Sequence, residues 1–177
     1  SDNLLHTIHS DIVKVQTLKV LDLSNNCFNK LPIDFQNLTN LEVLRLDNNA
    51  FTEISSQITS ITTLKVLSMN KNRITTIPDT IGNMLSLTEL KLKDNNFTSI
   101  PVSIMLLTKL RIIELPVIPQ NELDSLVIDF LNNQQEVINN FNKKQQQKLQ
   151  RQKDRVARKE ARILARNTNT KIQEVSR

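Results

Sequence analysis

A repeat of 23 residues constrains the fold of this chain more than any other feature of its sequence. The repeat keeps its register over five blocks, which begin at Leu18, Leu41, Leu64, Leu87 and Leu110. Apolar residues occupy the first, fourth and sixth positions of each block. The first four blocks also carry asparagine at their ninth position: Asn26, Asn49, Asn72 and Asn95. A fixed period of this length indicates an array of stacked structural units.

The pattern inside one block predicts its local structure. Apolar and polar residues alternate at the start of the block, as they do in a strand with one buried face. The apolar residues that follow are two to four positions apart, which suits a chain that winds back beside its own strand. One unit cannot bury its leucines alone, but stacked units share a continuous core. We therefore predict an α/β solenoid with a curved parallel β-sheet, whose strands begin near the five block starts.

This template resembles the leucine-rich repeat family, in its 23-residue form with a Leu-Pro or Ile-Pro step. The step occurs here at Leu31-Pro32, Ile77-Pro78 and Ile100-Pro101. Intracellular proteins of this form include the Ras-suppressor proteins and the Scribble and Erbin scaffolds. The resemblance covers about two thirds of the chain. It implies that the four block asparagines bond the backbone of adjacent turns as a ladder, and that the protein binds other proteins.

The first residues of the chain fit the second half of a further block. Residues one period before matching positions of the first complete block are Asn3, Leu5, Ile8, Ile12 and Val15. A solenoid end without a polar cap exposes the leucines of its core. We therefore expect apolar surface at Ser1–Val15 unless something covers it, and we expect the sequence to be a fragment of a longer protein. The alternative is a natural chain that is capped by a partner or by its own dimer.

The repeat stops in its fifth block, so residues 1–118 form the repeat domain. Ile118 stands at the ladder position, and Pro116 and Pro119 cannot donate hydrogen bonds to a continuing array. Asn121 suits a helix N-cap, with Asp124 in the position of a capping box. An apolar stripe predicts a capping helix within residues 119–141 that closes the core; a docking face for a separate helix is the alternative. The stripe consists of Leu123, Leu126, Val127, Phe130, Val137, Ile138 and Phe141.

Charge is divided unevenly along the chain. Residues 1–141 have 11 Lys and Arg against 15 Asp and Glu, whereas residues 142–177 have 12 against 3. Helix-forming residues without Gly or Pro predict a basic helical extension over residues 142–177. The cations that we expect to bind an acidic partner are Lys143, Lys144, Lys148, Arg151, Lys153, Arg155, Arg158, Lys159, Arg162 and Arg166.

Two kinds of acidic partner remain open for this extension. Leu149, Val156 and Ile163 recur every seven residues as a thin apolar seam, which favours an acidic protein surface. RNA, held through its phosphates, is the alternative, although no aromatic residue beyond Phe141 could stack on bases. A coiled-coil dimer needs a second steady apolar position, which the seam lacks. Residues 172–177 resemble the first half of a calmodulin-binding IQ motif, so a calmodulin-like protein is a further candidate, although so short a match also arises by chance.

The binding surface of the solenoid is predicted on the concave face, where strand residues between the buried leucines point outward. A column of valines there is flanked by columns of polar and charged residues. The residues expected to bind a protein partner are Val20, Asp22, Val43, Arg45, Asp47, Val66, Ser68, Lys91 and Lys93. An exposed apolar stripe with a charged rim is typical of protein interfaces. The alternative is that the valines reflect β-propensity alone.

Composition argues against several classes of protein. Gly82 is the only glycine, so no glycine-rich loop can hold the phosphates of a nucleotide cofactor. Cys27 is the only cysteine, which excludes a disulfide framework and indicates a reducing, intracellular setting. No apolar run approaches the roughly 20 residues that span a bilayer. No nucleophile–base set or metal-ligand spacing is present, so we predict no enzyme, no cofactor and no metal.

These features together predict a non-catalytic interaction or scaffold subunit of a larger intracellular assembly, most simply in the cytoplasm. Two alternatives stay open. One is a ribonucleoprotein component that holds RNA through residues 143–166. The other is a cytoskeletal or ciliary (axonemal) subunit whose basic helix lies along an acidic filament.

Overall fold

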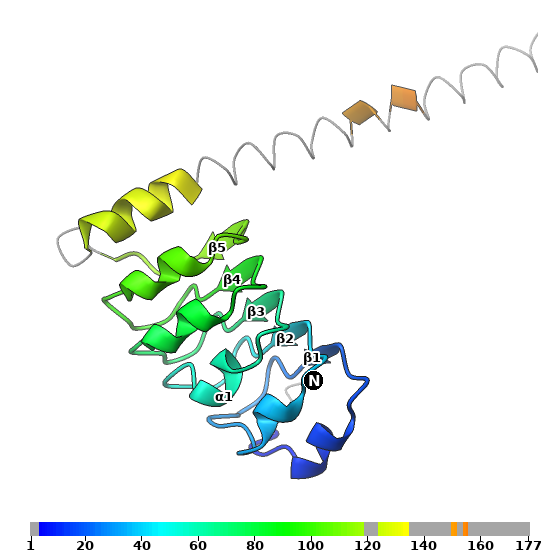
Figure 1. The fold of residues 1–177 in the computed structure, drawn as a ribbon. Helices are drawn as coiled ribbons and strands as arrows, with labels where there is room; N and C mark the ends of the chain where they lie inside the picture. Colours follow the sequence, from blue (N-terminus) through cyan, green and yellow to red (C-terminus); the bar gives the residue numbers. More distant parts are fainter. Residues whose placement is uncertain (1–3, 119–123, 135–149, 152–153, 156–177) are drawn as a thin grey trace, which may run out of the picture. The chain divides into compact units, whose positions relative to one another are not determined.

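The computed structural model describes residues 4–118, 124–134, 150–151 and 154–155. The chain divides into two compact units, residues 1–135 and 136–177. Five short strands follow one another at the period of the sequence: β1 (Val20–Asp22), β2 (Val43–Arg45), β3 (Val66–Ser68), β4 (Glu89–Lys91) and β5 (Ile112–Glu114). They form one open parallel sheet in the order β1-β2-β3-β4-β5 (Figure 1). This arrangement confirms the predicted fold class. Each strand begins two residues after the first residue of its block.

The register of the sheet repeats the register of the sequence. Val20 pairs with Val43, and Val43 pairs with Val66, so the Cα partners in neighbouring strands are one 23-residue period apart. The pairing continues in the same way from β3 to β5. Each block therefore contributes one strand and adds it directly beside the strand of the preceding block.

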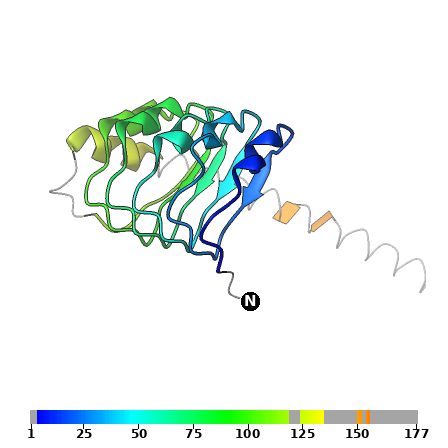
Figure 2. The same cartoon turned by 90° about the horizontal axis from the view of Figure 1, so that it is seen from below.

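Short helical segments run in a row along a different side of the solenoid from the strands (Figure 2). They are η1 (Ser10–Lys14), η2 (Phe35–Asn37), α1 (Ser56–Thr59), η3 (Asp79–Asn83) and η4 (Val102–Leu106). Pro78 and Pro101 stand at the N-caps of η3 and η4, both in extended conformation. Proline is tolerated at such a helix start because the N–H that it lacks would have no partner within the helix.

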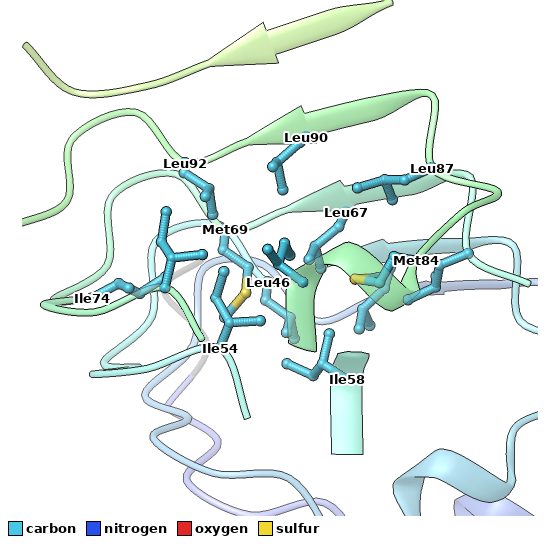
Figure 3. Packing of buried hydrophobic residues seen from close by; sticks show 14 of the residues in the cluster. Leu46, Ile54, Ile58, Leu67, Met69, Ile74, Met84, Leu87, Leu90 and Leu92 are labelled. Atoms are coloured by element: carbon cyan, nitrogen blue, oxygen red, sulfur yellow. The ribbon is translucent and has the colours of Figure 1, made fainter. Parts of the chain in front are cut away.

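The core lies between the strands and the helical segments. Leu67 and Leu90 point into it from β3 and β4, and Ile58 reaches it from α1 (Figure 3). Equivalent leucines of successive blocks, such as Leu44, Leu67 and Leu90, are fully buried. Because each leucine packs against the same position of the next block, the repeats share one continuous core. Burial of one such side chain contributes about 1.5–3 kcal/mol.

A helix over residues 125–134 packs against the same core after the last strand. Its N-cap is Asp124, whose Oδ1 accepts a 2.8 Å hydrogen bond from the Leu126 N–H. Val127 is fully buried, and Phe130 and Leu131 are partly buried against the core cluster. These three residues have the i, i+3, i+4 spacing of one helix face.

Two details of the predicted capping helix are wrong. Asp124 itself caps the helix, because its carboxylate lies where it accepts from the N–H two residues on. Leu126 was assigned to the buried stripe but is 56% exposed, because it precedes Val127 and therefore lies on a different side of the helix. Asn121, Leu123, Val137, Ile138 and Phe141 lie outside the described residues.

The beginning of the described chain stacks on the first complete block. Leu5 accepts a 2.9 Å hydrogen bond from the Cys27 N–H, and the Leu5 N–H donates to Asn26 Oδ1 at 3.3 Å. Leu4, Leu5 and Val15 are exposed, so apolar surface is present here, as expected from the sequence.

Candidate functional site

The ladder asparagines join adjacent repeats by hydrogen bonds. Asn49 donates from Nδ2 to the Leu23 carbonyl of the preceding block at 3.0 Å, and its Oδ1 accepts from the Phe28 N–H at 2.9 Å. Asn72 repeats both bonds one block later, with Leu46 at 2.9 Å and Phe51 at 3.1 Å. The ladder that the family resemblance implies is therefore present.

The four rungs of the ladder are not equally shielded from solvent. Asn95 bonds the Met69 carbonyl and the Ile74 N–H, and Asn26 bonds the Leu5 N–H. Asn72 is buried, whereas Asn26, Asn49 and Asn95 are only partly buried. Among the four ladder asparagines, Asn72 is therefore the one whose side-chain hydrogen bonds are best shielded from water.

The valine column predicted to lie on the concave face crosses three neighbouring strands. Val20 is 54% exposed, and Val43 and Val66 beside it are partly exposed. The register places their Cα atoms directly opposite one another. The same column continues as Glu89 in β4 and Ile112 in β5. The structure thus brings together an apolar strip that ends at a carboxylate.

Charged residues flank this strip in the next column of the sheet. Asp22, Arg45, Ser68 and Lys91 are register partners on successive strands. Asp22 and Arg45 are exposed. Lys91 forms a 3.3 Å ion pair with Glu89, which was not among the predicted binding residues. Lys93 is also exposed, with its backbone N–H bonded to Asn70 Oδ1 at 2.7 Å.

Ser68 is not the surface contact that the sequence predicted, because its side chain is only 4% exposed. Its hydroxyl donates a 2.7 Å hydrogen bond to Asp47 Oδ1, which also accepts from the Asn70 N–H at 2.7 Å. Asn70 in turn donates from Nδ2 to Glu114 Oε2 at 3.3 Å. Asp47 therefore has a structural role in this network, which links the turn after β2 with β3 and with the last residue of β5.

A row of ion pairs crosses the sheet where the strands begin. Glu42 accepts from the Lys65 ammonium at 2.6 Å and lies 3.8 Å from that of Lys19. The hydrogen bond from Lys65 and then the charge of Lys65 lower the pKa of the Glu42 carboxyl below its ordinary value, and Lys19 acts in the same direction. Sequence reasoning missed this row, although the alternation Lys19, Glu42, Lys65 at one period was a usable signal.

The turns that leave the strands repeat an uncommon backbone conformation. Asn25, Asn48, Lys71 and Asp94 all have φ between 54° and 59°, in the left-handed region. Asn and Asp tolerate this region better than other residues with a side chain, so Lys71 is the strained member of the series.

The described residues, 4–118, 124–134, 150–151 and 154–155, contain neither a membrane-spanning helix nor a metal-binding cluster. Within these ranges, no helix is both long enough and apolar enough to cross a membrane. No group of three or more His, Cys, Asp or Glu side chains in the described part of the chain could hold a metal ion.

Most of the basic extension lies outside the described residues. Of its predicted cations, the structure describes Arg151 and Arg155, which are exposed. Next to them, Gln150 Nε2 donates a 2.9 Å hydrogen bond to Asp154 Oδ1, four residues further along the chain.

In-register parallel strands, a backbone ladder of asparagines and one shared core define a repeat solenoid. The chain belongs to the leucine-rich repeat family, since the family model for a leucine-rich repeat region matches residues 3–175. No curated protein sequence matches the chain.

Solved structures of leucine-rich repeat proteins have the same fold. The leucine-rich repeat ectodomain of the Arabidopsis thaliana receptor kinase GASSHO1/SCHENGEN3 is 34% identical, with a TM-score of 0.57 over 63% of this chain. A leucine-rich repeat protein of Leptospira interrogans is 28% identical, with a TM-score of 0.52 over 66% of this chain. An internalin of Listeria monocytogenes, 23% identical with a TM-score of 0.55 over 64% of this chain, shares the fold. The match covers only 14% of the Arabidopsis chain, 36% of the Leptospira chain and 33% of the Listeria chain.

Proposed function

We propose that this chain is a non-catalytic protein-interaction module, and that its partner binds the concave face of the sheet. The observation that carries the proposal is the strip of Val20, Val43 and Val66, with Arg45 and Asp22 exposed beside it. Three valines in register on adjacent strands make a continuous apolar surface, and a charged rim fixes the orientation of a partner.

The packing of the solenoid makes this strip a preformed site. Val43 and Val66 belong to strands whose intervening leucines, Leu44 and Leu67, are fully buried in the core. The strands therefore cannot rotate to hide the valines without exposing the leucines. A rigid surface loses little conformational entropy when a partner binds.

The structural relatives support a binding role. The Arabidopsis ectodomain, 34% identical over the matched region, was solved in complex with CASPARIAN STRIP INTEGRITY FACTOR 2. A related repeat stack thus binds another molecule. We extend the proposal to a scaffold role within a larger intracellular assembly, for which the single cysteine and the basic extension are the support.

The experiment isolates the tagged full chain from its source cells and quantifies the co-isolated proteins. Val43→Asp places a carboxylate in the valine strip, and Arg45→Glu reverses a rim charge. The matched controls are Val102→Asp and Lys109→Glu, which change exposed residues of η4 and of the turn after it. Loss of about tenfold or more of a specific partner with the first pair alone supports the proposal. Equal recovery with all four variants contradicts it.

We infer a separate role for the basic extension, which is to bind an acidic protein surface. Residues 142–166 hold ten Lys and Arg against Asp154 and Glu160, and the seam of Leu149, Val156 and Ile163 offers apolar contacts. Like charges three or four residues apart repel within a helix, and an acidic surface relieves that repulsion.

The dependence of affinity on salt concentration distinguishes RNA from an acidic protein as the partner of this extension. Binding to single-stranded RNA weakens steeply with salt, with a slope of about −0.7 per neutralised phosphate. The test titrates the full chain with RNA and with the isolated partner across a salt series, with and without Ala at the three seam positions. Seam-dependent binding to the protein supports the inference. Steep, seam-independent binding to RNA alone contradicts it and favours a ribonucleoprotein role.

A further inference from the structure

A second surface of the solenoid has the form of a binding groove, away from the valine strip. It is a cleft of about 500 Å³ beside the turns that leave β1 and β2, and it extends across parts of four successive blocks. This volume lies within the range of about 300–1,000 Å³ that is usual for ligand sites. The lining residues come from the eighth to twelfth positions of the blocks, which the valine strip does not use.

The groove is hollow because two successive blocks carry small side chains at their tenth position. These are Cys27 and Ala50, and the next block has Arg73 there. The backbone beneath them is fixed, because the Cys27, Ala50 and Arg73 N–H groups donate to the carbonyls of Leu5, Phe28 and Phe51 at 2.8–2.9 Å. The hollow is thus built into the repeat stack, with a guanidinium at one end.

One wall of the groove offers a matched donor and acceptor. Asn48 Nδ2 donates to Asn25 Oδ1 at 3.0 Å, which ties the two amides together. Within the described residues, the Asn25 amide N–H groups and Asn48 Oδ1 form no further hydrogen bond, and both side chains are exposed. Such a pair has the hydrogen-bonding pattern of a peptide backbone, so it can bond an extended chain laid beside it.

The charge of the groove is positive, although the unit around it is acidic. Among the residues that the structure describes, its lining includes the cation Arg73 and no carboxylate. Within the described residues, Arg73 is exposed and forms no ion pair. Residues 1–141 as a whole carry an excess of four acidic residues. A free guanidinium above a small-residue floor is a site for a carboxylate, which it can bind through two hydrogen bonds.

We propose that this groove binds an extended acidic peptide segment, with a carboxylate of the peptide on Arg73 and its backbone along Asn25 and Asn48. Within the described part of the chain, the groove has no aromatic lining residue on which a nucleic-acid base could stack. This disfavours RNA as the ligand. The groove would give the chain a second protein contact that is independent of the concave face.

The test uses the ¹⁵N-labelled full chain and two capped hexapeptides, one alternating glutamate and alanine and the other glutamine and alanine. The peptides have nearly the same shape and differ in charge. We expect the glutamate peptide to shift the amide signals of residues 25–29, 48–50 and 73, and the glutamine peptide to bind at least about fivefold more weakly. Because each amide signal reports on one residue, binding in the groove can be distinguished from binding to the basic extension.

Two pairs of variants then test the geometry. Arg73→Ala should weaken groove binding by about tenfold, whereas Lys109→Ala removes an equal charge elsewhere on the surface and should leave it unchanged. Ala50→Leu fills the groove and should abolish the shifts, whereas Asn96→Leu changes the same block position outside the groove lining. The proposal is overturned if shifts are confined to residues 142–166, if both peptides bind equally, or if oligouridylate alone occupies the groove.

Discussion

Asn72 donates a 2.9 Å hydrogen bond from its side chain to the carbonyl oxygen of Leu46, which lies one block earlier in the stack. The same side chain donates to the Met69 carbonyl at 3.0 Å and accepts from the Phe51 N–H at 3.1 Å. One buried amide therefore completes hydrogen bonds within its own turn and between two blocks. Because these backbone groups are shielded from water, no solvent molecule replaces the amide easily.

Replacing this amide should weaken the whole stack. We expect Asn72→Ala to lower the free energy of unfolding by about 2–4 kcal/mol, because buried backbone donors and acceptors lose their partner. Asn29→Ala is the control, since Asn29 is exposed, and should change the free energy by less than about 0.5 kcal/mol. Urea denaturation followed by circular dichroism measures both. Equal midpoints for the two variants would show that the ladder does not stabilise the fold.

Gly82→Ala should destabilise the chain even though alanine is the better helix former. A Cβ at Gly82 would lie 2.8 Å from the Ser103 carbonyl oxygen and 3.0 Å from Leu106 Cδ1, so η3 and η4 would have to separate. We expect a loss of about 1–3 kcal/mol, as for other overpacked sites. Thermal denaturation beside Asn83→Ala, an exposed neighbour, is the measurement. Increased stability of the Gly82 variant would mean that helix propensity outweighs the close approach.

Lys71→Asn should stabilise the chain by about 1 kcal/mol. Lys71 has φ 54°, a conformation that costs most residues with a side chain about 1–2 kcal/mol and asparagine less. Asn25 and Asn48 already occupy the same position in two other blocks. The control is Lys109→Asn, which removes an exposed charge elsewhere. If both variants gain or lose the same stability in chemical denaturation, charge rather than backbone strain is responsible.

The Glu42 carboxyl should titrate below its ordinary range. Lys65 hydrogen-bonds it at 2.6 Å, and this bond and the Lys65 charge lower its pKa. The stabilisation from this ion pair should be complete above the pKa of an unfolded glutamate and should vanish as pH falls through the lowered value. A ¹³C NMR titration of Glu42 measures the pKa. Lys65→Met should raise it toward the ordinary value, and Lys109→Met should not; an unchanged pKa in Lys65→Met would exclude Lys65 as the cause.

The strands and the ladder could be predicted because each depends on one residue type at one position of the period. Asn72 must supply a donor and an acceptor to a turn, and Leu67 must face a core that only a stack can close. Both requirements act within a block and its neighbours, so they are visible in the sequence. The register of the sheet could be predicted as well, because the spacing between successive blocks is always 23 residues.

The other features depend on contacts that no periodic pattern reveals. The Ser68 hydroxyl donates to Asp47, which lies just after the adjacent strand β2, and neither residue alone indicates this pairing. Leu126 is exposed because the helix is capped by Asp124 and turns Val127, the next residue, toward the core. The backbone strain at Lys71 could not be predicted, because a lysine gives no sign of positive φ, whereas Asn25, Asn48 and Asp94 at the same block position tolerate it. The groove depends on the small side chains of Cys27 and Ala50. They are visible in the sequence, but they indicate a binding groove only once the structure shows Arg73 beside them.

Hydroxyl-radical footprinting of the full chain, free and in its native assembly, tests the central claim most directly. Val43, Val66 and Arg45 should become strongly protected in the assembly. Leu85 and Val102, which are exposed in and beside the helical segments, should remain as reactive as in the free chain. This result would place the partner on the concave face. Unchanged reactivity of Val43, Val66 and Arg45 in an assembly that protects Leu85 and Val102 would contradict the account.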